Sequence, residues 1–107
     1  MTRLFKQESE AILMRFSLVA RIDTDSPDLM EPFIRQLVPK GSINEEGEKG
    51  FVVRVNMEGS SAKDLNRSML SALRKVEKKT RLRTEWTAED GTILRFFDYV
   101  LKKRIPP

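Results

Sequence analysis

The residues best suited to chemistry in this chain are basic, and they gather in one stretch. Between positions 67 and 83 a single acid, Glu77, faces seven cations: Arg67, Arg74, Lys75, Lys78, Lys79, Arg81 and Arg83. Cations at this density can neutralise the phosphates of a nucleic acid, which makes binding depend on salt. Such contacts position a nucleic acid without reading its sequence. The same cations also suit a solvated helix C-terminus, where they favour the helix dipole, so both interpretations stay open.

Aromatic residues follow this basic stretch closely enough to act with it. Trp86, Phe97 and Tyr99 are candidates for stacking on bases, as aromatic side chains do in RNA-binding proteins. If this segment is a β-hairpin, Phe96 or Phe97 must face away from the core, because successive strand side chains point to opposite faces. The Gly-Phe-x-Phe signature of the RNA-recognition motif is absent. The alternative is that these rings lie in the core or in a dimer interface.

Catalytic chemistry is restricted by the absence of two residue types. The 107 residues include no His and no Cys, which excludes disulfides, thiolate nucleophiles, Cys/His zinc sites and Ser-His-Asp triads. Asp23 and Asp25 form an Asp-x-Asp pattern of the kind that binds magnesium. However, Asp28 falls in an expected first helical turn, where an acid stabilises the helix dipole. No Gly-rich phosphate loop is present. We therefore predict no catalytic residues, no metal, no cofactor and no enzymatic activity.

The net charge of +4 is unevenly distributed. Residues 23–48 carry seven acids and two bases, whereas residues 60–107 carry twelve bases and six acids. This asymmetry indicates something about partners rather than about fold. No apolar run approaches the roughly 18 residues of a membrane span, and residues 1–10 are too short and too charged for a signal peptide. We therefore expect a cytoplasmic protein with no membrane association.

The order of the expected elements follows from hydrophobic spacing. Residues 11–23 alternate in the pattern of a half-buried strand, and Ser26-Pro27 is typical of a helix start, with that helix ending at Pro39-Lys40-Gly41. A short edge strand at 42–46 and a strand at 51–57 follow, joined by a turn. The apolar stripe of residues 61–79 predicts an amphipathic helix that begins with a Ser61/Asp64 capping box.

The last quarter of the sequence allows two interpretations. Residues 81–87 and 92–101 flank Ala-Glu-Asp-Gly, and their Thr, Trp, Phe, Tyr and Val content favours a hairpin. The alternative is a C-terminal helix, capped by Thr87 and Asp90, with Lys102-Lys103-Arg104 at its negative end.

Together these elements predict one domain over 1–107, in which 1–10 is a flexible N-terminus and 81–107 is a C-terminal hairpin or helix. The predicted fold is an α+β two-layer sandwich. Its antiparallel sheet has two helices on one face, in the ferredoxin-like order β-α-β-β-α-β with room for an extra C-terminal strand. The other sheet face would be mixed and polar, suited to solvent, a partner or RNA. From the two clearest strands it would carry Arg15, Ser17, Val19, Arg21, Arg54 and Asn56.

Residues 11–76 resemble the small dimerising subunit family of the KEOPS complex, which includes the cancer/testis-antigen-like proteins. The strand Phe51-Val-Val-Arg-Val-Asn-Met57 is similar to the last hairpin strand of that family, and the turn Glu58-Gly-Ser-Ser-Ala62 leads into its helix. In the family's helical frame this chain keeps Leu65, Ser71 and Leu73. It has Asn66 in place of an arginine and Leu70 in place of an asparagine.

This resemblance implies a non-catalytic, homodimeric accessory subunit that works with larger protein subunits of a tRNA-modification complex and assists RNA binding. Two other function classes stay open. One is a free-standing RNA- or DNA-binding module of ferredoxin-like type. The other is a regulatory domain that senses a small molecule.

Overall fold

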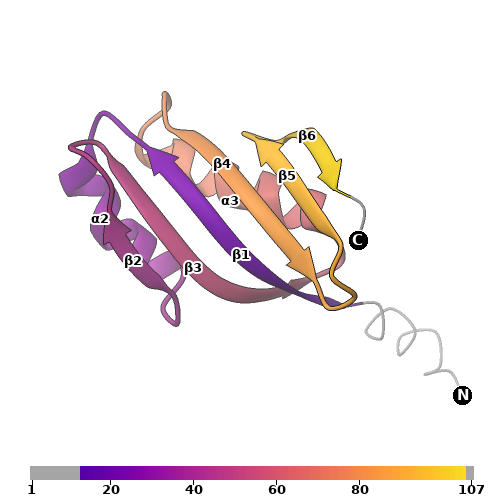
Figure 1. Ribbon diagram of the computed structural model, residues 1–107. Helices are drawn as coiled ribbons and strands as arrows, with labels where there is room; N and C mark the ends of the chain where they lie inside the picture. The colour runs from indigo at the N-terminus through magenta and orange to yellow at the C-terminus, as the bar shows by residue number, and fades with distance from the viewer. Residues whose placement is uncertain (1–12, 106–107) are drawn as a thin grey trace, which may run out of the picture.

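An antiparallel sheet of six strands forms one layer of the protein, and two helices form the other (Figure 1). The computed structural model describes residues 13–105, so the expected flexible N-terminus lies outside the described residues. The strands follow one another across the sheet in the order β2-β3-β1-β4-β5-β6. The elements in chain order are β1 (Met14–Asp23), α2 (Pro27–Leu37), β2 (Ser42–Glu45), β3 (Gly50–Gly59), α3 (Ala62–Val76), β4 (Arg81–Ala88), β5 (Ile93–Phe97) and β6 (Val100–Ile105).

Strand β1 is central to the sheet, and its alternating pattern gives it one core face. It pairs antiparallel with β3 on one side and with β4 on the other, so that Leu18 lies between Val55 and Trp86. The even-numbered side chains from Phe16 to Ile22 are buried, as the sequence predicted. The odd-numbered side chains therefore point to the opposite face.

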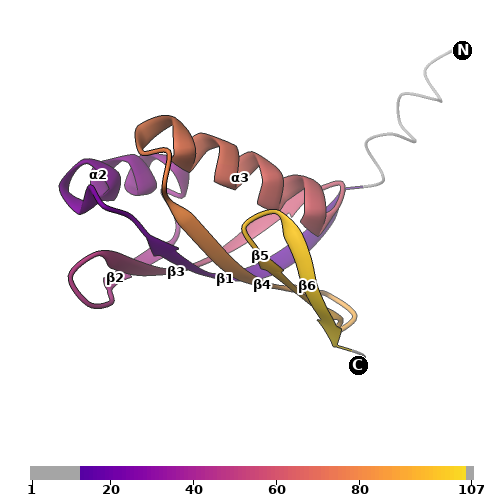
Figure 2. The same ribbon diagram turned by 90° about the horizontal axis from the view of Figure 1, so that it is seen from above.

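Both helices cover the same face of the sheet and leave the other face open (Figure 2). Helix α2 begins at Pro27 as expected, and it tolerates the exposed Pro32 within its length while Met30 and Ile34 enter the core. Helix α3 contributes Met69, Leu70 and Leu73 to that core. The α+β sandwich with two helices on one face is confirmed, and the open face has the polar composition that was predicted.

The start of α3 contains half of the expected capping box. The Ser61 hydroxyl accepts a hydrogen bond of 3.1 Å from the Asp64 backbone N–H, which is the predicted N-cap. The Asp64 carboxylate does not complete the reciprocal bond, because it accepts instead from the Ser60 hydroxyl at 3.1 Å. An aspartate is also one methylene shorter than the glutamate that usually makes this return contact.

The C-terminal quarter is a hairpin with a further strand, so the alternative helix over residues 92–104 is wrong. Strands β4 and β5 pair antiparallel, with Thr84 opposite Phe96 and Trp86 opposite Leu94. The segment predicted as one strand over 92–101 is divided at Asp98, whose φ of 59° lies in the left-handed region. Asparagine and aspartate tolerate that conformation better than most residues. The chain therefore turns at Asp98, and β6 returns alongside β5.

Candidate nucleic-acid interface

The basic stretch is divided between a helix, a loop and a strand. Helix α3 ends at Val76, so the predicted helix over 61–79 is three residues too long. Lys78 and Lys79 lie in the following loop, and Arg81 and Arg83 belong to β4. Lys78 and Arg81 therefore do not lie on the helix that carries Arg67 and Arg74.

Glu77 explains where the helix ends. Its carboxylate accepts hydrogen bonds from the Lys79 N–H at 2.8 Å and from the Asp25 N–H of the β1–α2 loop at 3.2 Å. Thr80 reinforces the turn, because its hydroxyl donates to the Glu77 carbonyl at 2.7 Å. The backbone amides of Lys79 and Asp25, in that order, hold the pKa of the Glu77 carboxyl below its ordinary range. The only acid of the basic stretch is thus a structural anchor between two loops.

Six of the seven predicted cations are exposed, and the seventh has a structural role. The half-buried Arg74 donates from Nε to the Thr80 carbonyl at 2.9 Å, and its other end lies 3.2 Å from the Asp98 carboxylate. Arg74 thereby joins α3 to the α3–β4 loop and to the β5–β6 turn. The exposed cations are Arg67, Lys75, Lys78, Lys79, Arg81 and Arg83.

Tyr99 brings an aromatic ring to this basic surface. The β5–β6 turn places it against the outer side of α3, where it is 52 % exposed and lines a hollow of about 370 Å³. We call this the Tyr99 hollow, and the other residues that line it are Arg67, Leu70, Ser71, Arg74 and Lys75. Four predicted site residues therefore meet in one place. Leu70 and Ser71 were not among the predicted site residues, although both share a helical face with Arg67 and Arg74 at spacings of three and four.

Trp86 belongs to the core and is not accessible to a base. It is fully buried, its ring meets Phe16 edge to face with centroids 6.0 Å apart, and its indole N–H donates to the Asn66 side chain at 2.9 Å. The expectation that Trp86 stacks on nucleic acid is therefore wrong. Trp86 and Leu82 are both even-numbered residues of β4, so the alternation of the strand places both side chains on the core face.

Phe97 lies on the open face of the sheet, as predicted for one of the two neighbouring residues Phe96 and Phe97. Phe96 is buried in the core. The Arg81 guanidinium lies over the Phe97 ring, with its carbon 4.7 Å from the ring centroid. That distance is within the range of a cation–π interaction. Arg81 and Phe97 thus form a pair on the face opposite to the Tyr99 hollow.

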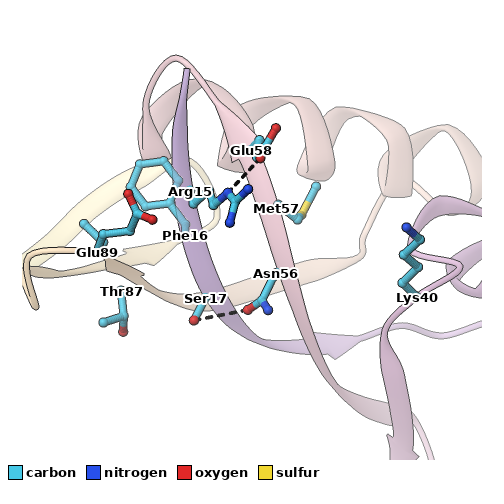
Figure 3. Close-up of a pocket in the computed structure, with 10 residues that line it drawn as sticks. Arg15, Phe16, Ser17, Lys40, Asn56, Met57, Glu58, Thr87 and Glu89 are labelled. Atoms are coloured by element: carbon cyan, nitrogen blue, oxygen red, sulfur yellow. Dashed lines mark hydrogen bonds and ion pairs between the residues drawn. The ribbon is translucent and has the colours of Figure 1, made fainter. Parts of the chain in front are cut away.

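Another hollow lies at the far end of the sheet and has balanced charges (Figure 3). It encloses about 590 Å³ beside β1, β3 and β4. Arg15 forms an ion pair of 2.9 Å with Glu58, and the Ser17 hydroxyl donates to the Asn56 side chain at 3.2 Å (Figure 3). Lys40 and Glu89 also line the hollow. Cations and acids are equal in number there, so this hollow offers less attraction to a polyanion than the Tyr99 hollow does.

The described residues, 13–105, form neither a cluster of metal ligands nor a membrane-crossing helix. In that range no group of three or more acidic, His or Cys side chains is placed to hold a metal ion. Within the same residues, neither helix has the length and apolar character that crossing a bilayer requires. Comparisons with protein-family models, curated proteins and solved structures found none that matches this chain.

Proposed function

We propose that this protein binds nucleic acid and has no catalytic activity of its own, with the Tyr99 hollow as its contact surface. The observation that carries the proposal is the convergence of Arg67, Arg74 and Lys75 around one exposed tyrosine. Cations neutralise phosphates, and an exposed aromatic ring stacks on an unpaired base. A surface that combines the two suits a folded RNA with an accessible loop.

The electrostatics of the hollow support this assignment. Arg67 and Lys75 are exposed cations, free to follow a phosphate backbone. Arg74 is held in place by Thr80 and Asp98, so its guanidinium is fixed before a ligand arrives. A side chain that is already ordered loses less conformational entropy on binding. The hollow thus combines one cation that is held in place with two that are exposed.

The decisive experiment measures the affinity for a labelled RNA hairpin as a function of salt. Each phosphate contact in a duplex contributes about 0.9 to the slope of log K against log salt. The double variant Arg67→Gln/Lys75→Gln should therefore lower the magnitude of that slope by about two. Lys40→Gln is the matched control, since it removes a charge elsewhere and should leave the slope unchanged. An equal slope in the double variant and the wild type would contradict the proposal.

A narrower form of the proposal rests on the family resemblance. It assigns the chain to a cytoplasmic, homodimeric accessory subunit of a tRNA-modification complex that works with larger protein subunits. It also assigns the first four strands and two helices to the ferredoxin-like plait, supported by the element order and by the sheet order β2-β3-β1-β4. Light scattering coupled to size-exclusion chromatography tests the dimer, and a monomer at micromolar concentration would contradict it.

A second candidate function, small-molecule sensing, is favoured by an apolar hollow on the other side of Tyr99. This hollow encloses about 460 Å³ and is lined by Ser61, Ala62, Lys63, Leu94, Phe96, Tyr99 and Val100. Apolar concave surfaces of this size suit small ligands. A metabolite that raises the melting temperature, with no effect of RNA, would favour this function over the first.

A further inference from the structure

We infer that the open face of the sheet binds a short unpaired segment of nucleic acid, next to the ends of β4 and β5. The inference rests on the proposed function and names its substrate class: a single strand rather than a duplex. The binding surface is the part of the open face around Arg81 and Phe97, extending to Arg21, Arg83 and Arg95. We call it the arginine face.

Register brings the members of the arginine face together from three strands. Arg83 of β4 lies opposite Arg21 of β1 and, on its other side, opposite Phe97 of β5. In the neighbouring row, Val19 of β1 lies between Arg54 of β3 and Glu85 of β4, and Glu85 lies opposite Arg95 of β5. These residues are far apart in sequence, so only the sheet assembles them. Neither α2 nor α3 covers this face (Figure 2).

The type of cation on this face is informative. On the open face of β1, β3, β4 and β5 every cation is an arginine: Arg15, Arg21, Arg54, Arg81, Arg83 and Arg95. Lysine predominates instead in the α3–β4 loop, at Lys78 and Lys79. A guanidinium is planar, stacks on flat rings and contacts phosphate with two donors at once, whereas an ammonium does neither. The sheet face is therefore equipped for bases as well as for charge.

The Arg81–Phe97 pair supplies a ready stacking surface. Phe97 lies beneath the guanidinium at 4.7 Å, which restrains the side chain of Arg81 while leaving the residue exposed. A base can then stack on the side of the guanidinium away from the ring. Bases in a duplex are already stacked on their neighbours and do not present their planes to a protein surface. This geometry favours an unpaired base.

A hollow beside this pair is placed to take a phosphate. It encloses about 340 Å³, and three arginines line it together with one acid, Glu85. Arg95 Nε lies 2.9 Å from the Glu85 carboxylate, but its N–H does not point toward that oxygen as a hydrogen bond requires. Among the described residues, this N–H has no hydrogen-bond acceptor. Arg21 pairs with Glu46 at 3.0 Å, and Arg83 lies 3.9 Å from Asp23. These ion pairs are solvent-exposed and therefore weak, so a phosphate can compete for the arginines.

The two basic surfaces adjoin at one end of the molecule. The exposed Lys78 and Lys79 connect the end of α3 to Arg81 at the start of β4. A folded RNA held at the Tyr99 hollow could therefore extend an unpaired segment around this loop onto the arginine face. Lys75, Lys78, Lys79 and Arg81 are all exposed along this path.

The test compares binding of an unpaired oligonucleotide of about ten nucleotides, as RNA and as DNA, with binding of an RNA duplex of the same length. The oligonucleotide carries the fluorescent base 2-aminopurine, whose emission falls when it stacks. Arg81→Lys keeps the positive charge but removes the planar guanidinium, and Phe97→Leu removes the aromatic ring. Both variants should bind the unpaired strand about tenfold more weakly, as expected for one lost stack, with less quenching and with duplex affinity unchanged. Arg35→Gln, on α2, is the control for charge.

Several outcomes separate this inference from the proposed function. Unpaired RNA and DNA that bind alike would assign the face to single strands in general, whereas tighter RNA binding would assign it to RNA. Wild-type affinity and quenching in Arg81→Lys would overturn the inference while the proposed function stands. If either variant lost equal affinity for the unpaired strand and for the duplex, that result would also overturn the inference. Circular dichroism establishes that each variant is folded, and absence of any binding by the wild type would refute both proposals.

Discussion

Asn66 is the buried polar residue whose replacement should cost the protein most. It belongs to α3, and its side chain is fully buried between that helix and the sheet, where it connects three partners. The side-chain oxygen accepts from the Thr84 hydroxyl at 2.6 Å and from the Trp86 indole at 2.9 Å, and the amide donates to the Asp98 carbonyl. The helix, β4 and the β5–β6 turn are therefore held together by one amide group.

Replacement of Asn66 by leucine retains much of its volume and removes all of its hydrogen bonds. The Trp86 N–H keeps a second acceptor, the Thr84 hydroxyl at 3.1 Å, so two groups lose their partner: the Thr84 hydroxyl hydrogen and the Asp98 carbonyl. Each unsatisfied buried group costs about 1–3 kcal/mol. We therefore expect a loss of about 2–6 kcal/mol in the free energy of unfolding, out of a total of about 5–15 kcal/mol for a domain of this kind.

Urea unfolding followed by circular dichroism measures this loss. Ser68→Ala is the matched control, because Ser68 is exposed on the same helix and should change stability by less than about 0.5 kcal/mol. The double variant with Thr84→Val should be destabilised by less than the sum of the two single variants, since the two side chains share one hydrogen bond. A loss below about 1 kcal/mol in Asn66→Leu would refute the assigned role of the amide.

Two further predictions concern a titrating carboxyl and a tight turn. Backbone hydrogen bonds hold the pKa of Glu77 below its ordinary value of 4.5, so its stabilising contribution is present above that value and is lost as the pH falls through the lowered pKa. The urea midpoint of Glu77→Gln should therefore lie below that of the wild type at neutral pH and approach it in acid; a constant difference would contradict this. In Gly50→Ala the new Cβ would lie 2.6 Å from the Glu46 carbonyl oxygen, which should cost about 1–3 kcal/mol in urea unfolding, and unchanged stability would disprove the clash.

Local pattern was sufficient for the central strand β1 and for the starts of both helices. The period of two in residues 11–23 placed Phe16 and Leu18 in the core, and the structure agrees. The end of α3 was not predictable in the same way. It depends on Glu77 binding the Asp25 amide, which lies 52 residues away in sequence. No pattern within residues 61–79 contains that contact, so the apolar stripe predicted a longer helix.

The sequence predicted many residues of the candidate site, but not how the fold brings them together. The basic stretch and its aromatic neighbours contain the residues of the Tyr99 hollow, but a single left-handed residue, Asp98, is what directs Tyr99 back onto α3. The arginine face depends on register between strands that are remote in sequence, which alternation alone does not supply. The wrong prediction for Trp86 could have been avoided, because Trp86 and Leu82 are both even-numbered residues of β4. Strand alternation therefore already placed Trp86 on the core face.

The central position of β1 has a consequence for the order in which the protein can fold. Both neighbours of β1 come later in the chain: Phe16 pairs with Met57 of β3 and with Ala88 of β4. During synthesis β1 therefore emerges without a partner, and it remains an open edge until β4 has left the ribosome. Non-local pairings of this kind slow folding, and unpaired edges invite aggregation. The strand that organises the finished sheet is thus the one that depends longest on the rest of the chain.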